Sequence, residues 1–323
     1  MTIRQLLLER YAPLYQLSPR TVTLYGHTLD RFRDFLGREA ELTDLEDVVI
    51  SRFLAHRLDD PSRPVRRTTV LKDRVQLLAV ANYAAKKRLI PEFVTLKPMR
   101  AAGRLPEAYS VDDVAALLAT CRQLPGLEAD VPRAWWWETF LGVCVQTAGR
   151  KGEVERLTWA NVDASRRVVL FLASTRKGKT RDLERGLSEP LAALLEQERK
   201  ADDQPVWPWE LRPDMKYIRL KAICRRAGVK YRAFHAFRKT AASMVAKAGQ
   251  SAQELLDHDR ASTSEKHYLD QRIVGRRVSA AEVLPDFGFS SRTHADTLHS
   301  PPGQSEYQAS ASARDAEPPC REP

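Results

Sequence analysis

Residues 167–187 read RVVLFLASTRKGKTRDLERGL, and this stretch decides the fold class because its composition differs from that of the chain around it. Its first seven residues are rich in β-branched and large apolar side chains, which favour a strand. The polar run RKGKTR then predicts a turn, and DLERGL predicts a second short strand. We therefore expect a β-hairpin or small antiparallel sheet in a chain that is otherwise mainly helical.

The residues before this stretch carry helix signals. Ser18 followed by Pro19 predicts a helix start, and the amphipathic pattern that follows ends at Gly37. Thr43 and Glu46 predict a capping box for the next helix, which should end before Asp60.

A longer helix is expected to open at Thr68 or Thr69. Residues 91–108 then contain three prolines and a glycine, which predicts a linker. Ser110 and Asp113 form a second predicted capping box, after which helical periodicity resumes.

The apolar stretch from Trp135 to Val145 should be buried, and helices should resume at Glu189 and continue to about residue 283. The end of the chain is rich in Ser, Pro and Ala without periodicity, which predicts disorder. The expected organisation is a helical domain over 1–95, a linker over 96–108, a second domain over 109–286 and a tail over 287–323.

Composition narrows the function. The 323 residues carry a formal net charge of +10, and the sequence pI near 9.5 favours polyanionic partners. The last 36 residues carry a net charge of −2, so the basic character belongs to the rest of the chain. No apolar run is long enough for a membrane span, and the N-terminus lacks a signal-peptide pattern, which predicts a soluble cytoplasmic protein. The four cysteines form no CxxC pair, so neither a disulfide framework nor a metal site is expected.

Two segments place basic side chains near turns. In TAGRKGE, Arg150 lies at the junction of two predicted helices, and Glu153 lies three residues on, where it can pair with the arginine. In the turn of the predicted hairpin, Lys177 or Lys179 could deliver an ammonium group to a phosphate. Taken alone, such an arginine is more typical of a surface salt bridge, and such a lysine is more typical of a solvated hairpin turn.

Two further segments add histidines and a tyrosine. His235 and Arg238 share one face at the start of a predicted helix. His258 should end a short helix that starts at a Ser251/Glu254 capping box. Ser262 and Glu265 should cap another helix, which carries Tyr268 in its second turn. Taken alone, such a tyrosine is typically a core or interface residue.

In this order, the segments resemble the active site of the tyrosine recombinase (phage integrase) family. The resemblance covers about residues 1–285 and implies a SAM-like helical core-binding domain followed by a DNA breaking-rejoining catalytic domain. It differs at three places. The family's T-G-x-R reads TAGR here, and LGH reads LDH, with Asp257 in place of glycine. Ten residues lead from His258 to Tyr268, where the family commonly has nine, which implies one extra residue in the loop through Arg260 and Ala261. The implied catalytic residues are Arg150, Lys177, His235, Arg238, His258 and the nucleophile Tyr268, with Glu153 and Lys179 in support; the family's K-G pattern favours Lys177 over Lys179.

A phosphodiester repels nucleophiles, so an enzyme without a metal must supply fixed positive charge. Arg150 and Arg238 suit that task, because guanidinium groups hold two phosphate oxygens at once. Cationic neighbours would favour the phenolate of Tyr268, His235 could accept its proton, and His258 could hydrogen-bond a non-bridging oxygen. A hairpin lysine could protonate the departing 5′ oxygen. The resemblance implies a 3′-phosphotyrosyl intermediate with no metal, cofactor or ATP.

The resemblance also implies a site-specific recombinase, associated with the nucleoid and serving a mobile element. The protein would bind double-stranded DNA at specific recombination sites and form a homo-tetramer on that DNA. Accessory DNA-bending proteins would be further partners. Residues 271–283 would form a helix that packs on a neighbouring protomer. The candidate DNA contacts are Arg63, Arg66, Arg67, Lys86, Lys87, Arg88, Lys97, Arg100 and Arg104.

Two other functions stay open at this point. A type IB topoisomerase-like relaxase would share the chemistry but rejoin the same strand. A non-catalytic DNA-binding protein on an integrase scaffold would keep the fold without the reaction.

Overall fold

The computed structural model describes residues 1–275 except 62–63, 104, 177 and 179–180. These residues divide into two compact units, Met1–Pro106 and a second unit that begins at Glu107. The predicted tail and residues 276–283 lie outside the described residues.

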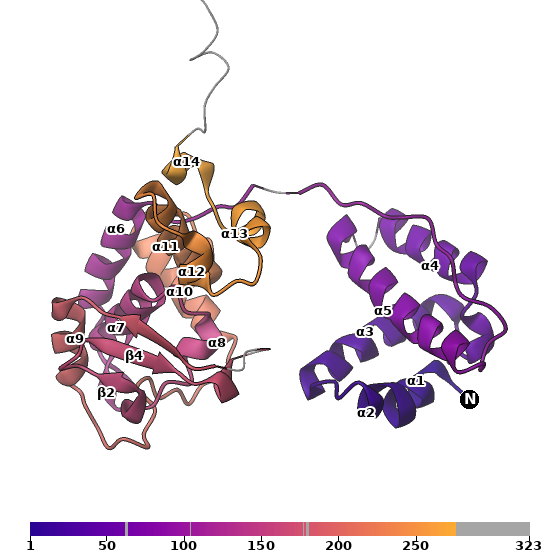
Figure 1. Ribbon diagram of the computed structural model, residues 1–323, viewed down its shortest axis with the longest axis horizontal. Helices are drawn as coiled ribbons and strands as arrows, with labels where there is room; N and C mark the ends of the chain where they lie inside the picture. Colours follow the sequence, from indigo (N-terminus) through magenta and orange to yellow (C-terminus); the bar gives the residue numbers. More distant parts are fainter. Residues whose placement is uncertain (62–63, 104, 177, 179–180, 276–323) are drawn as a thin grey trace, which may run out of the picture. The chain divides into compact units, whose positions relative to one another are not determined.

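The first unit is helical (Figure 1). As predicted, the hydroxyl of Ser18 accepts a hydrogen bond from the Thr21 N–H, and Gly37 ends the same helix with a φ of 71°. A π-helical turn, Leu7–Tyr11, joins the first two helices. The α-helices are α1 (Ile3–Leu6), α2 (Ala12–Leu14), α3 (Pro19–Leu36), α4 (Asp47–Asp59) and α5 (Arg67–Lys86).

Two predicted helix starts in this unit are wrong. Thr43 lies within a 3-10 turn, Leu42–Asp44, because the Asp44 carboxylate accepts the Glu41 N–H and closes a turn of its own. Glu46 is therefore the N-cap of α4 and not its third residue. The long helix α5 begins at Arg67, one or two residues before the predicted start at Thr68 or Thr69, because Arg66 is the last residue with extended backbone.

The core of the first unit encloses one buried carboxylate. Asp73 on α5 is 1% exposed. Its two oxygens accept hydrogen bonds from Thr28 at 2.9 Å, Arg31 at 2.7 Å and Arg57 at 3.3 Å. These partners lie on α3 and α4, so the carboxylate joins the three longest helices of the unit. A buried charge is tolerated in a protein when it is paired and hydrogen-bonded in this way.

The second unit is mainly helical around a small sheet. The predicted hairpin is confirmed as β4 (Val168–Phe171) paired with β5 (Leu183–Gly186), with Val168 opposite Gly186 and Phe171 opposite Leu183. A short strand, β3 (Val162–Asp163), adds to β4, and the sheet is antiparallel in the order β3-β4-β5. A separate two-residue hairpin pairs β1 (Leu127–Glu128) with β2 (Val131–Pro132).

Helix α7 (Arg133–Gln146) lies in the core of this unit, and its predicted burial is confirmed. Trp136, Trp137 and Phe140 are fully buried on it. The predicted capping box of α6 is present, with hydrogen bonds in both directions between Ser110 and Asp113. The α-helices are α6 (Val111–Arg122), α7 (Arg133–Gln146), α8 (Lys151–Val154), α9 (Glu189–Glu196), α10 (Met215–Arg226), α11 (His235–Lys247), α12 (Ala252–Leu256), α13 (Ala261–His267) and α14 (Gln271–Val274).

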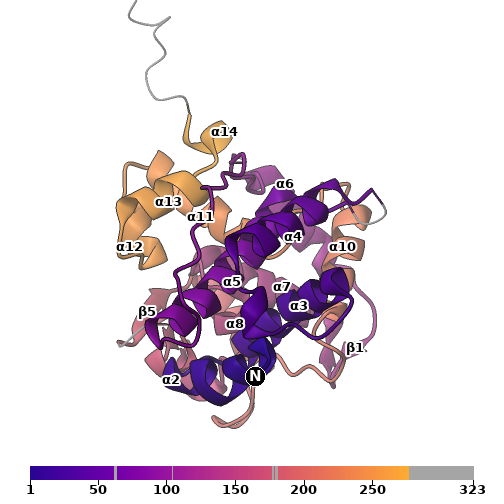
Figure 2. The same cartoon turned by 90° about the vertical axis from the view of Figure 1, so that its right-hand side faces the viewer.

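The predicted start of α13 is wrong. Arg260, not Ser262, is its N-cap, because Arg260 is extended and the first backbone bond runs from the Thr263 N–H to the Arg260 carbonyl. Tyr268 consequently lies just after the last helical residue and not in the second turn. Helices α11, α12 and α13 lie together in both views (Figure 1 and Figure 2).

The buried carboxylate of the first unit generates a prediction. Asp73→Ala leaves two arginines around an empty site, so the unfolding free energy of this unit should fall by about 3–5 kcal/mol. All six tryptophans lie in the second unit, so tryptophan fluorescence in urea reports on that unit, whereas far-UV circular dichroism reports on both. The expected result is an earlier dichroism transition with an unchanged fluorescence transition.

Asp34→Ala is the control, because Asp34 pairs with Arg33 at an exposed position. Such a pair contributes about 0–1 kcal/mol. Equal losses from the two variants would contradict a special role for Asp73.

Candidate active site

Arg150 is placed by the junction between α7 and α8. It is the N-cap residue of α8, and its side chain is 36% exposed. Its guanidinium Nη1 donates to Oε1 of the buried Glu153 at 2.7 Å, and its backbone N–H donates to Oε2 at 3.1 Å. The predicted pairing is therefore present, and it holds the arginine from both ends.

Arg238 is placed one turn into α11 and is 4% exposed. Its Nη1 donates to the carbonyl of Ala148 and its Nη2 to the carbonyl of Leu256 at 2.6 Å. Its Nε has no hydrogen-bond partner among the described residues. The guanidinium group thus joins α11 to the α7–α8 junction and to the end of α12.

His258 follows α12. Its Nε2 lies 3.4 Å from Nη2 of Arg238, and its Nδ1 lies 2.9 Å from Oγ of the buried Ser264. The Ser264 hydroxyl on α13 therefore orients the ring so that the other nitrogen faces Arg238.

Tyr268 lies among these groups. The centre of its ring is 5.0 Å from that of His235 and 4.7 Å from that of His258, and the guanidinium carbon of Arg238 is 5.5 Å from it. The Tyr268 carbonyl accepts a hydrogen bond from Ser243 on α11 at 3.4 Å. The tyrosine is therefore held next to α11 just beyond the end of its own helix.

The cations act on one another electrostatically. Desolvation, and then the charges of Arg238, Lys239 and Arg150, lower the pKa of His235 to about 4, although part of its ring is exposed. Desolvation, followed by repulsion from Arg150, lowers the pKa of Arg238 to about 10. At neutral pH, His235 is therefore neutral and Arg238 remains charged. A neutral imidazole can accept a proton, and a cluster of guanidinium groups is suited to an anion.

Two of the three departures from the family's pattern, at residues 148 and 257, share one backbone feature. Ala148 has a φ of 52° and Asp257 a φ of 50°, so both stand in the left-handed region that favours glycine. Gly149 is required for a different reason, because an added Cβ would lie 2.8 Å from Val154 and 3.1 Å from Phe171. At positions 148 and 257 the chain therefore keeps a backbone conformation that favours glycine, although neither residue is glycine.

The structure brings five of the six predicted catalytic residues together, while Lys177 and the supporting Lys179 lie outside the described residues. Sequence reasoning missed Ser264 and Ser243, since nothing in the local pattern distinguishes them from other helical serines. It also missed Asp270, which is 2% exposed and accepts the Ala108 N–H at 2.8 Å.

The candidate DNA contacts lie on the first unit. Arg66 and Arg67 are exposed at the start of α5, and residues 86–88 are exposed at its end. Because α5 has 20 residues, the two groups are about 30 Å apart and would contact different phosphates. Lys97 and Arg100 are also exposed, whereas Arg63 and Arg104 lie outside the described residues.

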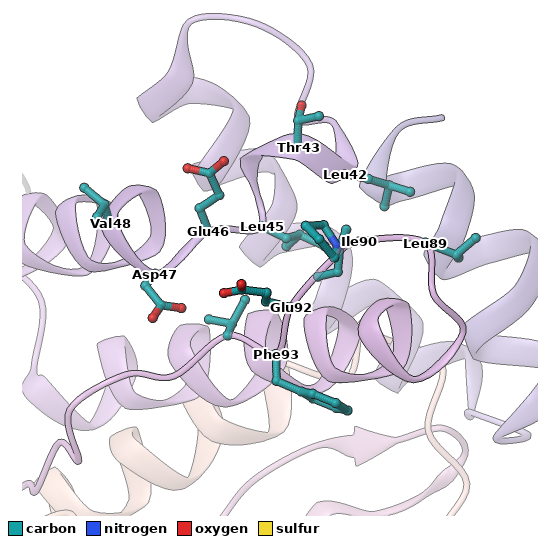
Figure 3. Close-up of a pocket in the computed structure, with 12 residues that line it drawn as sticks. Leu42, Thr43, Leu45, Glu46, Asp47, Val48, Leu89, Ile90, Glu92 and Phe93 are labelled. Carbon is teal, nitrogen blue, oxygen red and sulfur yellow. The ribbon is translucent and has the colours of Figure 1, made fainter.

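Two other features of the described chain bear on ligands. A pocket in the first unit is lined by residues 42–43, 45–48 and 89–94 (Figure 3). They include the acidic Glu46, Asp47 and Glu92, so the charge of this pocket does not suit a phosphate. In the part of the chain that the structure describes, no group of three or more His, Cys, Asp or Glu side chains could hold a metal ion. None of the described helices has the length and apolar character needed to cross a membrane.

The helical fold with its three-stranded sheet is that of a tyrosine-type site-specific DNA recombinase. The model of the phage integrase family matches residues 109–273, about half of the chain, and the chain belongs to this family.

Solved structures share the fold. A lambda integrase tetramer bound to a Holliday junction has 16% sequence identity and a TM-score of 0.64, with 86% of this chain and 80% of that chain covered. The XerH site-specific recombinase bound to a palindromic difH substrate has 18% identity and a TM-score of 0.62, with 82% and 79% covered. The Tn1549 transposon integrase in complex with transposon right end DNA has 11% identity and a TM-score of 0.64, with 88% and 98% covered. No curated protein matches the chain.

The backbone at the α7–α8 junction generates a prediction. Ala148→Gly should stabilise the second unit by about 0.5–1 kcal/mol, because relief of the left-handed strain exceeds the added freedom of the unfolded chain. Gly149→Ala should destabilise it by about 1–3 kcal/mol, because its Cβ overpacks the contact with Val154. Urea unfolding followed by tryptophan fluorescence measures both. A loss of stability in Ala148→Gly would contradict this account.

The environment of His235 generates a second prediction. Its pKa is about 4 in the folded chain and near the ordinary 6.5 in the unfolded chain, so between these pH values the unfolded chain binds more protons. Stability from this group is complete above pH 6.5 and falls as the pH approaches 4. Thermal melts at pH 7 and pH 4.5 should show a smaller acid-induced loss for His235→Gln than for the wild type. His267→Gln, at an exposed position, should keep the wild-type loss.

Proposed function

We propose that this protein cuts and rejoins duplex DNA at specific sites through a covalent 3′-phosphotyrosyl intermediate, with Tyr268 as the nucleophile. The observation that supports this best is the position of the Tyr268 ring, within 5.0 Å of both histidine rings and 5.5 Å of the Arg238 guanidinium. A phosphate group bound beside Tyr268 would therefore lie close to the positively charged guanidinium of Arg238.

The two arginines would hold the non-bridging oxygens. The Arg150 side chain is partly exposed, and Nη1 of its guanidinium group donates to Glu153. The other N–H groups of the guanidinium remain for a ligand. Arg238 is buried and fixed, and its Nε is unpaired among the described residues. Fixed donors stabilise developing charge without reorganising during the reaction.

His235 would accept the proton of Tyr268 as the phosphorus–oxygen bond forms. Its low pKa supports this role, because the ring is neutral before the reaction. His258 would donate a hydrogen bond to a non-bridging oxygen, oriented by Ser264. Lys177 would protonate the departing 5′ oxygen, with Lys179 as the alternative donor.

The rest of the organisation follows from the same proposal. Residues 1–95 would form the core-binding domain, 96–108 the linker and 109–286 the catalytic domain, with phosphate contacts from the exposed basic residues of α5 and from Lys97 and Arg100. Four protomers would assemble on the recombination site and act on the DNA of a mobile element in the cytoplasm, with DNA-bending proteins as helpers. A lambda integrase tetramer on a Holliday junction shares the fold.

A first prediction concerns the nucleophile. A nicked suicide substrate carrying the cognate site should trap a covalent protein–DNA adduct with the wild type and none with Tyr268→Phe, which keeps the ring and its packing but lacks the hydroxyl. Denaturing gel electrophoresis separates the adduct. Identical behaviour of the two proteins would sink the enzymatic proposal and favour a non-catalytic DNA-binding protein, whereas relaxation of supercoiled DNA without exchange of strands would favour the relaxase.

A second prediction concerns Arg150. Arg150→Ala should reduce single-turnover cleavage by on the order of 10²–10³-fold with little loss of DNA affinity, because its charge acts mainly on the transition state. Arg212→Ala is the control, since that arginine is exposed, pairs with Asp214 and lies outside the proposed site. If affinity fell in proportion to the cleavage rate, Arg150 would be a binding residue and not a transition-state one.

A further inference from the structure

Asp257 stands where the family's motif has glycine, and its side chain does something that glycine cannot do. Its carboxylate oxygens accept hydrogen bonds from Nη2 of Arg176 at 2.6 Å and from Nη2 of Arg181 at 3.3 Å. The two arginines flank the turn between β4 and β5. The Arg176 and Asp257 side chains are 1% and 10% exposed, so most of this contact is shielded from solvent.

A second contact joins the same two regions. Arg185 on β5 donates to the carbonyls of Glu254 at 2.9 Å and Leu255 at 2.7 Å. The next carbonyl, that of Leu256, accepts from Arg238. The last three carbonyls of α12 therefore all accept from guanidinium groups, and that of Glu254 also accepts the Asp257 N–H at 3.1 Å. The end of α12, directly before His258, is anchored to the sheet on one side and to α11 on the other.

Arg176 also reaches the first motif. Its Nε lies 4.0 Å from Oε1 of Glu153, the same oxygen that accepts from Arg150. A continuous series of charged contacts thus runs from Arg150 through Glu153 and Arg176 to Asp257. Asp257, the last residue of this series, has a left-handed backbone with a φ of 50°. Aspartate is among the non-glycine residues that tolerate this conformation best.

We propose that Asp257 is a positioning residue for the leaving-group step of the proposed function, on which this inference rests. Its carboxylate fixes Arg176, the residue directly before Lys177, and so holds the base of the β4–β5 turn against the loop that carries His258. Asp257 thus lacks the conformational freedom of the family's glycine but contributes an ion pair that glycine cannot form. Loss of the carboxylate should impair proton donation to the 5′ oxygen more than it impairs attack by Tyr268.

The test compares two suicide substrates, one with the natural 5′-bridging oxygen and one with a 5′-bridging sulfur, whose departure needs no proton donor. Asp257→Asn keeps the size and the tolerance of left-handed backbone but removes the charge. It should slow single-turnover cleavage of the oxygen substrate by on the order of 10–100-fold, while the sulfur substrate is cleaved within about threefold of the wild-type rate. Lys177→Ala should show the same selective rescue.

Two further variants separate positioning from stability. Asp257→Gly relieves the backbone strain and also removes the carboxylate, so it should fold at least as well as Asp257→Asn yet show the same oxygen-to-sulfur ratio of rates. Glu128→Gln is the matched control, because Glu128 is a buried carboxylate that pairs with Arg133 at 3.2 Å near the start of α7, at the other end of that helix from Arg150. It should lower the melting temperature without changing the ratio. Because the ratio is measured within one protein, a smaller folded fraction does not affect it.

The outcomes are distinct. Equal slowing of both substrates by Asp257→Asn, or a wild-type ratio in Asp257→Gly, would overturn the positioning role and leave the proposed function standing. If the wild type forms no adduct with either substrate, the proposed function fails and this role fails with it.

Discussion

The second unit depends on one buried cation. The Arg238 guanidinium has no buried carboxylate as its direct hydrogen-bond partner in the described structure; it is satisfied by the carbonyls of Ala148 and Leu256 and lies beside His258. Burial of a charge with only neutral partners is unfavourable, and this cost appears as the lowered pKa of Arg238. The same arrangement places a buried guanidinium group, with no carboxylate directly bonded to it in the described structure, 5.5 Å from the centre of the Tyr268 ring.

The surrounding residues are arranged around this cation. The carbonyl of Ala148 points to Arg238 from a backbone conformation that favours glycine, and the carbonyl of Leu256 comes from the end of α12, where helical carbonyls have no internal partner. Alanine side chains, among them Ala241 and Ala242, pack around these segments and allow their close approach. The site is therefore built largely from main-chain groups at helix ends, and a few side chains secure them.

Local patterns in the sequence predicted much of this. The β-branched and apolar composition of residues 167–173, followed by a polar turn, predicted the β4–β5 pair. The order of the basic and aromatic motifs predicted which side chains meet near Tyr268. The helix starts at Glu46 and Arg260 were not predicted, because serines and threonines nearby satisfied the same capping rule without being used. The contacts of Asp257, Ser264 and Asp270 could not be predicted either. Each joins segments whose proximity depends on tertiary packing, as in the bond from Arg176 to Asp257 across 81 positions.

Tyr268 is anchored by side chains and backbone groups on both sides of Leu269. The Ser243 hydroxyl donates a hydrogen bond to the Tyr268 carbonyl and accepts one from the backbone N–H of Asp270. The Asp270 carboxylate accepts a hydrogen bond from the backbone N–H of Ala108, at the beginning of the same unit. Tyr268 is thus tied through two short links to the helix that carries Arg238 and to the first residues of its own unit. The tyrosine, the two histidines and the two arginines of the candidate site therefore all lie within the same unit of the chain.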